Sequence, residues 1–359
     1  MSKKPFLPLY EPAPWFVAAS TSNPHYNFSS VGGLFVAMTF LGSKNQKSSA
    51  ELNQAFRTHR DLFNDQHSCW FGVMMDAENQ QRAEYQESMP GIRYFWDFDF
   101  KIAKQYRVLL DNQIYYSCTF IINPMMRIIS IIPLASSAEQ HVSQVLNQLN
   151  KLIIEDRKYF KIAPVLIIPD ILEHALCRTL INYYHEQGGT DSGFMKEKEG
   201  YTVAQLDHSF KRRQDCVIED FALQKAISMR IANRLAPEIK KAFQFNATRI
   251  ERYIVACYSA EDKGFFRPHR DDTTKGTAHR RFAVTINLNA EEFEGGELCF
   301  PEFGRQTYRA PTGGAVVFSC SLLHEARPVT QGVRFATLPF LYDDAAAQLR
   351  EENYHFIKK

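Results

Sequence analysis

Short apolar runs alternate with segments of helical spacing in the N-terminal part of the chain, a pattern typical of α/β domains. Residues 48–63 and 137–155 have the helical spacing, the second as an amphipathic helix that begins near Ser137. Four apolar runs have the length of a buried strand: 33–41, 69–75, 116–123 and 128–133. The last two predict a hairpin around Pro124. Strand, helix, strand, hairpin and helix follow one another as in a thioredoxin-like domain.

The C-terminal half has a different pattern. The charged segment 156–164 predicts a domain boundary, Pro169-Asp170 predicts a helix start, and Gly188-Gly189 its end. A polar loop is expected from there to Asp215, and then a helical stretch split by Pro237. Five short strands follow: 252–258, 283–289, 297–300, 314–319 and 334–341.

Helices packed on many short strands suggest a jelly-roll barrel. We therefore expect an α/β thioredoxin-like N-terminal domain over 1–157. An α+β double-stranded β-helix (jelly-roll) domain is expected over 164–359.

Composition narrows the class of protein. Lys+Arg number 42 and Asp+Glu 40, which favours neither a nucleic-acid partner nor a membrane-surface partner. The seven cysteines are odd in number and form no CxxC pair, so a reduced, cytoplasmic chain is expected. No signal-peptide core follows the N-terminus, and the apolar runs are far shorter than a membrane span.

Candidate chemistry concentrates in His269-Arg270-Asp271 and in His324, which follows after 52 intervening residues. On an extended strand, residues two apart point to the same face, as two ligands of one metal require. Two imidazoles and one carboxylate suit Fe(II) and leave coordination positions open for a cosubstrate and oxygen. Arg334, ten residues after His324, could meet the far carboxylate of a dicarboxylic 2-oxo acid.

This region resembles the prolyl-4-hydroxylase-like branch of the 2-oxoglutarate and iron(II) oxygenases. The likeness covers roughly residues 165–342, with its motifs in the last part in the family's order: 264–271 (GFFRPHRD), 280–281 (RR), 295–298 (GGEL), 300–301 (FP), 311–315 (PTGGA), Phe318, His324, 328–329 (PV), Gly332 and Arg334. The resemblance implies that His269, Asp271 and His324 bind the metal. It also implies that Arg334 pairs with the side-chain carboxylate of 2-oxoglutarate.

Further cosubstrate contacts follow from the same resemblance. Tyr258 is similar to the family tyrosine that lines 2-oxoglutarate, although it stands further from Gly264 than expected. The family often has a threonine where this chain has Ala283. Thr285 and Asn287 share the face of Ala283 by strand alternation and could substitute for it.

The resemblance implies Fe(II) as cofactor, 2-oxoglutarate and O2 as cosubstrates, and ascorbate as an optional reductant. Succinate and CO2 would accompany hydroxylation of a C–H bond in an amino acid, a peptidyl (for example prolyl) residue or a small metabolite. The carboxylate of Asp271 favours hydroxylation over halogenation, because related halogenases lack it. A homodimer stays open, and so does a second reading in which the site senses oxygen or 2-oxoglutarate without turnover.

The N-terminal region resembles the peroxiredoxin (redoxin) branch of the thioredoxin fold in 12–16 (PAPWF), 34–41 and 116–124. The reactive cysteine of that family follows the first core strand, but residues 42–49 hold none. Cys69 and Cys118 fall inside predicted strands, where a buried, inert thiol is expected. A thiol peroxidase is therefore the weaker alternative, and a role in substrate access, dimerisation or stability stays open.

Several basic residues near the motifs are expected to be solvated. Lys211-Arg212-Arg213 is interpreted as a solvated basic loop, with binding of an acidic substrate as the alternative. Arg280 and Arg281 are interpreted as charges on the barrel rim. His174, His208 and His279 are expected to be surface or structural residues, and Cys257 and Cys299 core residues.

Overall fold

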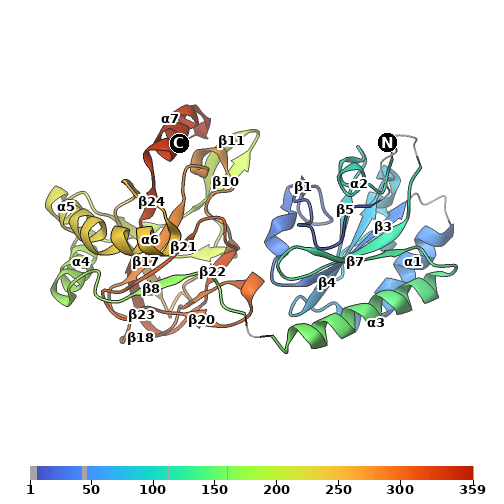
Figure 1. Ribbon diagram of the computed structural model, residues 1–359, viewed down its shortest axis with the longest axis horizontal. Helices are drawn as coiled ribbons and strands as arrows, with labels where there is room; N and C mark the ends of the chain where they lie inside the picture. Colours follow the sequence, from blue (N-terminus) through green and yellow to red (C-terminus); the bar gives the residue numbers. More distant parts are fainter. Residues whose placement is uncertain (1–5, 43–46, 111–113, 160, 359) are drawn as a thin grey trace. The chain divides into compact units, whose positions relative to one another are not determined.

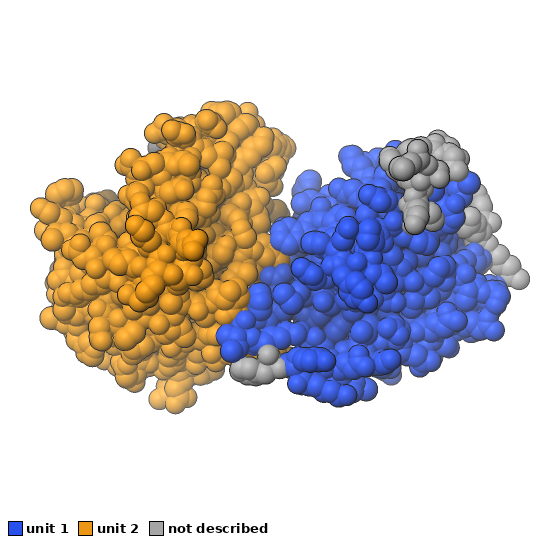
Figure 2. Space-filling model, viewed as in Figure 1, with its two compact units in different colours: residues 1–162, 301–304 blue, residues 163–300, 305–359 orange. Residues whose placement is uncertain are grey.

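The computed structural model describes residues 6–42, 47–110, 114–159 and 161–358 (Figure 1). The described chain forms two compact units (Figure 2). Unit 1 comprises residues 1–162 with 301–304, and unit 2 comprises 163–300 with 305–359. None of the helices in these described ranges is long and apolar enough to cross a membrane.

Unit 1 is built on a five-stranded sheet in the order β5-β4-β3-β6-β7. The strands are β3 (Phe35–Gly42), β4 (Ser68–Met74), β5 (Ile92–Trp96), β6 (Cys118–Ile122) and β7 (Ile128–Pro133). The first three run parallel, whereas β6 and β7 are antiparallel to their neighbours. Crossover segments with helices join the parallel strands, as parallel pairing requires.

Helices cover both faces of this sheet. On one face α1 (Lys47–Thr58) and α3 (Ala138–Asp156) bury Leu52, Phe56 and Val145 against Trp70. On the other face α2 (Lys101–Gln105) joins a second apolar cluster with β3, β4 and β6. The side chains of each strand alternate between these two clusters, which is why the strands are apolar throughout.

The strands and helices predicted for unit 1 are confirmed within a few residues, and Ser137 caps α3 by accepting from the N–H of Gln140 at 3.2 Å. The strand β5 and the short helix α2 were not predicted. Arg93 interrupts the apolar run of β5, and an ion pair with Asp65 at 2.7 Å allows it to sit there. The edge strand β5 was therefore not predicted, because a charged residue held in an ion pair interrupts its apolar run.

Besides a small three-stranded sheet, the described part of unit 2 contains two mainly antiparallel sheets. The larger has the order β14-β24-β17-β23-β15-β13-β9, with β21, β8 and β18 paired beside it, and the smaller has the order β12-β16-β22-β19-β20. The strands of the larger sheet are β8 (Leu166–Ile168), β9 (Thr190–Asp191), β13 (Gln214–Val217), β14 (Arg249–Glu251), β15 (Ile254–Ser259), β17 (Phe282–Asn287), β18 (Phe293–Gly295), β21 (Ala315–Ser319), β23 (Val329–Thr337) and β24 (Phe340–Tyr342). Those of the smaller are β12 (Lys211–Arg212), β16 (Phe265–His269), β19 (Leu298–Cys299), β20 (Thr307–Tyr308) and β22 (His324–Ala326).

The alternation of side chains along β15 determines which residues face the outer helices and which face the smaller sheet. Val255 in β15 packs with the helices α4 (His174–Gln187), α5 (Phe221–Arg230) and α6 (Ala236–Phe243) on the outer face of the larger sheet. Ile254, Ala256 and Tyr258 point the other way, into a cluster with Ala326 of the smaller sheet. The space between the sheets is therefore lined by side chains of both.

Two sequence predictions for unit 2 need correction: the start of its first helix and the polar loop. Helix α4 begins at His174 and not after Asp170, because Asp170 has a left-handed φ of 58° and the N–H groups of Ile171 and Leu172 donate to Gly313 O. The helix does end at Gly188, as predicted. The next helical stretch consists of two α-helices, as predicted: Pro237 lies in the first turn of α6, and a π-helical turn over Ile231–Leu235 joins α6 to α5.

The segment expected to be a polar loop is mostly strand. It contains β9, the hairpin of β10 (Phe194–Lys198) and β11 (Tyr201–Gln205), β12 and β13. Strand β11 also pairs with β25 (Ile357–Lys358), which follows the last helix, α7 (Asp344–Glu352). Thr202 is the one buried residue of the two hairpin strands, so no apolar alternation marked them as strand residues.

Candidate metal centre

The smaller sheet brings two histidines together. His269 ends β16, His324 begins β22, and the two residues are direct partners in the antiparallel register. Asp271 follows two residues after His269, beyond the end of the strand, and its N–H donates to Cys320 O at 2.9 Å. The prediction that His269 and Asp271 both lie on an extended strand is therefore right only for the histidine.

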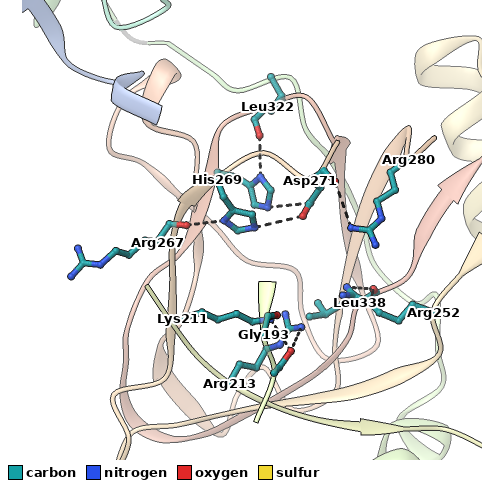
Figure 3. A network of polar contacts seen from close by, with 12 residues as sticks. Gly193, Lys211, Arg213, Arg252, Arg267, His269, Asp271, Arg280, Leu322 and Leu338 are labelled. Atoms are coloured by element: carbon teal, nitrogen blue, oxygen red, sulfur yellow. Dashed lines mark hydrogen bonds and ion pairs between the residues drawn. The ribbon is translucent and has the colours of Figure 1, made fainter. Parts of the chain in front are cut away.

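The three side chains converge (Figure 3). Asp271 Oδ1 lies 3.6 Å from His269 Nε2, and Asp271 Oδ2 lies 3.4 Å from His324 Nε2. One ligand atom from each residue lies within 4.8 Å of the others, and the group is the one cluster of this kind found among the described residues. An ion between them would contact all three.

Backbone carbonyls orient both imidazoles. His269 Nδ1 lies 2.7 Å from Arg267 O, and His324 Nδ1 lies 3.0 Å from Leu322 O. A carbonyl oxygen only accepts, so each Nδ1 must carry the proton. The Nε2 lone pairs are then free and face Asp271, as metal ligation requires.

The protonation states also suit a cation. Burial, followed by His269, lowers the pKa of His324 to about 4, so this imidazole is neutral near pH 7. Burial alone would raise the pKa of Asp271, but His324 and His269 hold it well below its usual range. The cluster thus offers two imidazole nitrogens and one carboxylate oxygen, the donor set of a two-histidine, one-carboxylate Fe(II) centre.

Arg334 lies in β23, is 3% exposed, and has a guanidinium without a carboxylate partner in the described chain. Its Nε donates to Asn287 Oδ1 at 3.4 Å, and its Cζ lies 5.0 Å from the ring centroid of Tyr258. Nη1 is buried and has no hydrogen-bond partner among the described residues. A buried, orphaned cationic donor is costly unless a ligand supplies the acceptor.

The Gly295-Gly296 motif makes room for Arg334. Gly296 has a φ of 71°, and a Cβ there would lie 3.0 Å from Arg334 Cδ and 2.9 Å from Val329. Any side chain at Gly296 would thus be strained and would press on the arginine. This is a second role for a pair that the sequence marks as a hairpin turn.

The predicted cosubstrate residues differ in their contacts. Tyr258 and Asn287 both contact Arg334, in agreement with their grouping in the sequence. Thr285 is buried in β17, two residues before Asn287, and none of its hydrogen bonds in the described chain reaches Arg334.

The basic segment 211–213 is not a solvated loop, which corrects the sequence interpretation. Lys211 and Arg213 are buried, and only Arg212 between them is exposed. Arg213 pairs with Asp215 at 2.7 Å and donates to Tyr258 Oη at 3.3 Å. Burial, followed by Arg213, lowers the pKa of Lys211 to about 6. The signal in the sequence was the spacing of these two cations, which stand two residues apart and therefore point to the same side of an extended segment.

Arg280 is likewise not a rim charge. It pairs with Glu251 at 2.7 Å and reaches Asp271 O at 3.5 Å. His279, 1% exposed, contacts the same carboxylate at 2.6 Å, which confirms its structural role. Arg280 thus supports the loop that carries Asp271.

The cysteines of unit 1 are inert. Burial raises the pKa of Cys69 to about 12 and also raises that of Cys118. Both lie in central strands, as predicted. The segment after β3 where a peroxiredoxin has its reactive cysteine is partly outside the described residues, but residues 42–49 contain no cysteine.

Comparison with known proteins agrees with the site. Residues 253–342 match the family described as the 2OG-Fe(II) oxygenase superfamily. A PKHD-type hydroxylase of a Synechococcus species is 31% identical over 98 residues, which are 26% of this chain and 43% of that protein. The chain therefore aligns with less than half the length of this relative.

Two solved structures are similar to different parts of the chain. A Pseudomonas putida prolyl-4-hydroxylase is 17% identical, with a TM-score of 0.39, over 50% of this chain and 94% of that one. A mitochondrial 2-Cys peroxiredoxin from Plasmodium falciparum is 19% identical, with a TM-score of 0.35, over 42% and 96%. Residues 253–342 include all three metal-binding candidates.

The His269, Asp271 and His324 cluster has the donor atoms of a non-haem iron site. This C-terminal region of the chain, residues 253–342, is similar to the 2OG-Fe(II) oxygenase superfamily and to PKHD-type hydroxylases. The description of that family implies Fe(II) and 2-oxoglutarate.

Proposed function

We propose that the protein is a dioxygenase that couples conversion of 2-oxoglutarate to succinate and CO2 with hydroxylation of a C–H bond. The substrate would be an amino acid, a peptidyl residue such as proline, or a small metabolite. The observation that carries this proposal is the convergence of His269, Asp271 and His324 within 4.8 Å, with both Nε2 atoms free to bind a metal.

The residues present fit both groups that the reaction needs. His269, Asp271 and His324 would hold Fe(II), which supplies the oxygen-activating chemistry when bound. Arg334 Nη1 would donate to the far carboxylate of 2-oxoglutarate, and this would satisfy its orphaned donor. Tyr258 and Asn287 would position that guanidinium, and we also propose that Thr285 lines the cosubstrate pocket.

We propose a finer fold and setting as well. Two mainly antiparallel sheets with a shared apolar lining fit a double-stranded β-helix for residues 164–359. The sheet order of unit 1, with three parallel and two antiparallel strands, fits a thioredoxin-like domain over 1–157. The seven free cysteines fit a reducing compartment, the cytoplasm.

Turnover of 2-oxoglutarate tests the proposal without knowledge of the substrate. The purified full chain should release succinate slowly when supplied with Fe(II), 2-oxoglutarate, oxygen and ascorbate, and His269→Ala should not. Tight binding of iron and 2-oxoglutarate with no succinate under any substrate would favour the sensor alternative. Peroxide consumption with a thiol reductant would be needed to support a thiol peroxidase, which the buried cysteines of unit 1 disfavour.

A further inference from the structure

The surroundings of the metal centre hold more buried cations than carboxylates. Besides Arg270, which donates to Ser321 O, five cationic side chains are buried or half-buried there, and they face three carboxylates. The cations are Lys211, Arg213, Arg252, Arg280 and Arg334, and the carboxylates are Asp215, Glu251 and Asp271. Bound Fe(II) would add two positive charges and 2-oxoglutarate would remove two, so the excess would persist in the loaded site.

The three carboxylates already have partners. Asp215 pairs with Arg213, Glu251 pairs with Arg280, and Asp271 faces the two histidines. Three cations therefore lack a carboxylate within the described chain: Lys211, Arg252 and Arg334. Arg334 is accounted for by 2-oxoglutarate under the proposed function. Arg252 donates twice to Leu338 O, at 3.1 and 2.7 Å, and stacks on Phe340.

Lys211 is the cation that remains. Its Nζ donates to Ser192 Oγ at 2.7 Å and to Gly193 O at 2.5 Å, so the third N–H that the amine gains on protonation has no acceptor in the described chain. The residue is only 4% exposed, and this burial disfavours its ammonium form. An anionic ligand beside Lys211 would stabilise the ammonium form and accept its third N–H.

Lys211 also lies beside the reaction centre. Its Nζ is 4.9 Å from the ring centroid of Phe266, and that ring stacks on the imidazole of His269 at 3.5 Å. Figure 3 shows Lys211 and Arg213 together on one side of the His269–Asp271 pair, with Gly193 between them. Arg213 extends this group of basic side chains to Tyr258, to whose Oη it donates a hydrogen bond. A group bound at Lys211 would therefore lie beside the Phe266 ring that stacks on His269.

We propose that the substrate carries its own carboxylate, that the Lys211 ammonium binds it, and that Arg213 and Arg252 add to the positive potential. The inference rests on the proposed function and narrows its substrate class. A free amino acid and the C-terminal residue of a peptide both present such a carboxylate. An internal peptidyl residue does not.

Paired acids and amides test the inference in the complete protein. The panel contains each free amino acid and, for each amino acid, a tripeptide that ends in it. Every compound is supplied in two forms, with a free carboxylate and with that group as a carboxamide. Carboxylates of the panel should stimulate succinate release. A response to free amino acids or to tripeptides then shows whether the bound carboxylate belongs to a free amino acid or to the C-terminal residue of a peptide. Equal stimulation by an acid and its amide, stimulation by amides alone, or no response from the whole panel would each overturn the inference.

Binding supplies the second readout. Under anaerobic conditions with Fe(II) and 2-oxoglutarate present, the Kd of a responding acid should rise about tenfold to a hundredfold in Lys211→Met, because one charge-assisted hydrogen bond is lost. Lys211→Arg should recover part of the affinity. Arg212→Met, an exposed neighbour on the opposite face of β12, is the matched control and should bind like the wild type.

Three results would contradict the role of Lys211. These are an unchanged Kd in Lys211→Met, an equal loss of affinity for acid and amide, or an equal effect of Arg212→Met. The proposed function fails separately, when the wild type neither binds 2-oxoglutarate with iron nor converts it. A wild type that does both, yet treats acids and amides alike, would refute this inference alone.

Discussion

Two buried polar networks, one in each unit, differ in how completely they are satisfied. In unit 1, Trp70 Nε1 donates to Thr39 Oγ1 at 2.9 Å, and Thr39 Oγ1 lies 2.8 Å from Thr119 Oγ1. Thr119 Oγ1 lies 2.8 Å from His141 Nε2, and His141 Nδ1 lies 3.2 Å from Pro133 O. Because the carbonyl must accept, the whole chain of hydrogen bonds has one direction, from each donor to the next acceptor.

The polar network of unit 2 contains a buried donor without a hydrogen-bond partner in the described chain, whereas each group of the unit 1 network named above has a partner. Arg334 Nη1 is buried without an acceptor among the described residues, and the Nε2 atoms of His269 and His324 lie 3.6 and 3.4 Å from the Asp271 carboxylate. Both units bury histidines and hydroxyl or guanidinium groups, so burial of polar residues alone does not indicate function. The unsatisfied donor and the converging ligand atoms distinguish a binding site from a structural network.

The largest effect is expected for removal of a metal ligand. His324→Ala should lower iron affinity by more than about a hundredfold, since loss of a mere hydrogen-bond partner of a ligand already costs 10–100-fold. Succinate release should fall to background. Iron binding is measured by titration under anaerobic conditions, with the exposed His25→Ala of unit 1 as control. Normal iron affinity in His324→Ala would remove this residue from the ligand set.

Arg334→Ala should come next. Removal of one partner of a buried charge pair costs ~2–5 kcal/mol, so the KM for 2-oxoglutarate should rise about 30-fold or more. Iron affinity without 2-oxoglutarate should change little, which separates this variant from the ligand variants. A KM within a factor of two of the wild type would reject the role of Arg334.

His141→Phe should break the satisfied network. The variant leaves the Thr119 hydroxyl without its acceptor and should lower the free energy of unfolding of unit 1 by ~1–3 kcal/mol. Thr119→Val in addition should recover little of this loss, because the Thr39 hydroxyl, which donates to Thr119, then lacks its acceptor. All three tryptophans, Trp15, Trp70 and Trp96, lie in unit 1, so denaturation followed by tryptophan fluorescence reports on this unit. A double variant as stable as the wild type would count against the network.

The smallest effect concerns pH. Burial lowers the pKa of His141 below its usual 6.5, so the unfolded chain binds this proton first as the pH falls. The contribution of His141 to stability is present above pH 6.5 and is lost as the pH falls below it, by at most ~1.4 kcal/mol per pH unit. The stability difference between wild type and His141→Phe should therefore shrink from pH 7 to pH 5. A constant difference would show that His141 does not titrate in this way.

The comparison of the two units also explains what the sequence could predict. The central strands of unit 1 are buried on both faces and therefore form apolar runs that are easy to recognise. The ligand residues were predicted because HxD, a later histidine and a later arginine have a recognisable order and spacing. Lys211 and Arg213 were misjudged because their burial depends on Tyr258 and Phe266, which are distant in the sequence and pack around them only in the folded sheets.

The central claim is that one ferrous ion binds between His269, Asp271 and His324 and that 2-oxoglutarate links this ion to Arg334. Anomalous diffraction at the iron edge, from crystals of the complete protein grown anaerobically with Fe(II) and 2-oxoglutarate, tests it most directly. The account predicts a single iron peak touching both Nε2 atoms and the Asp271 carboxylate, with a carboxylate of 2-oxoglutarate on the Arg334 guanidinium. An iron peak elsewhere, or a His324 imidazole turned away from the ion, would contradict it.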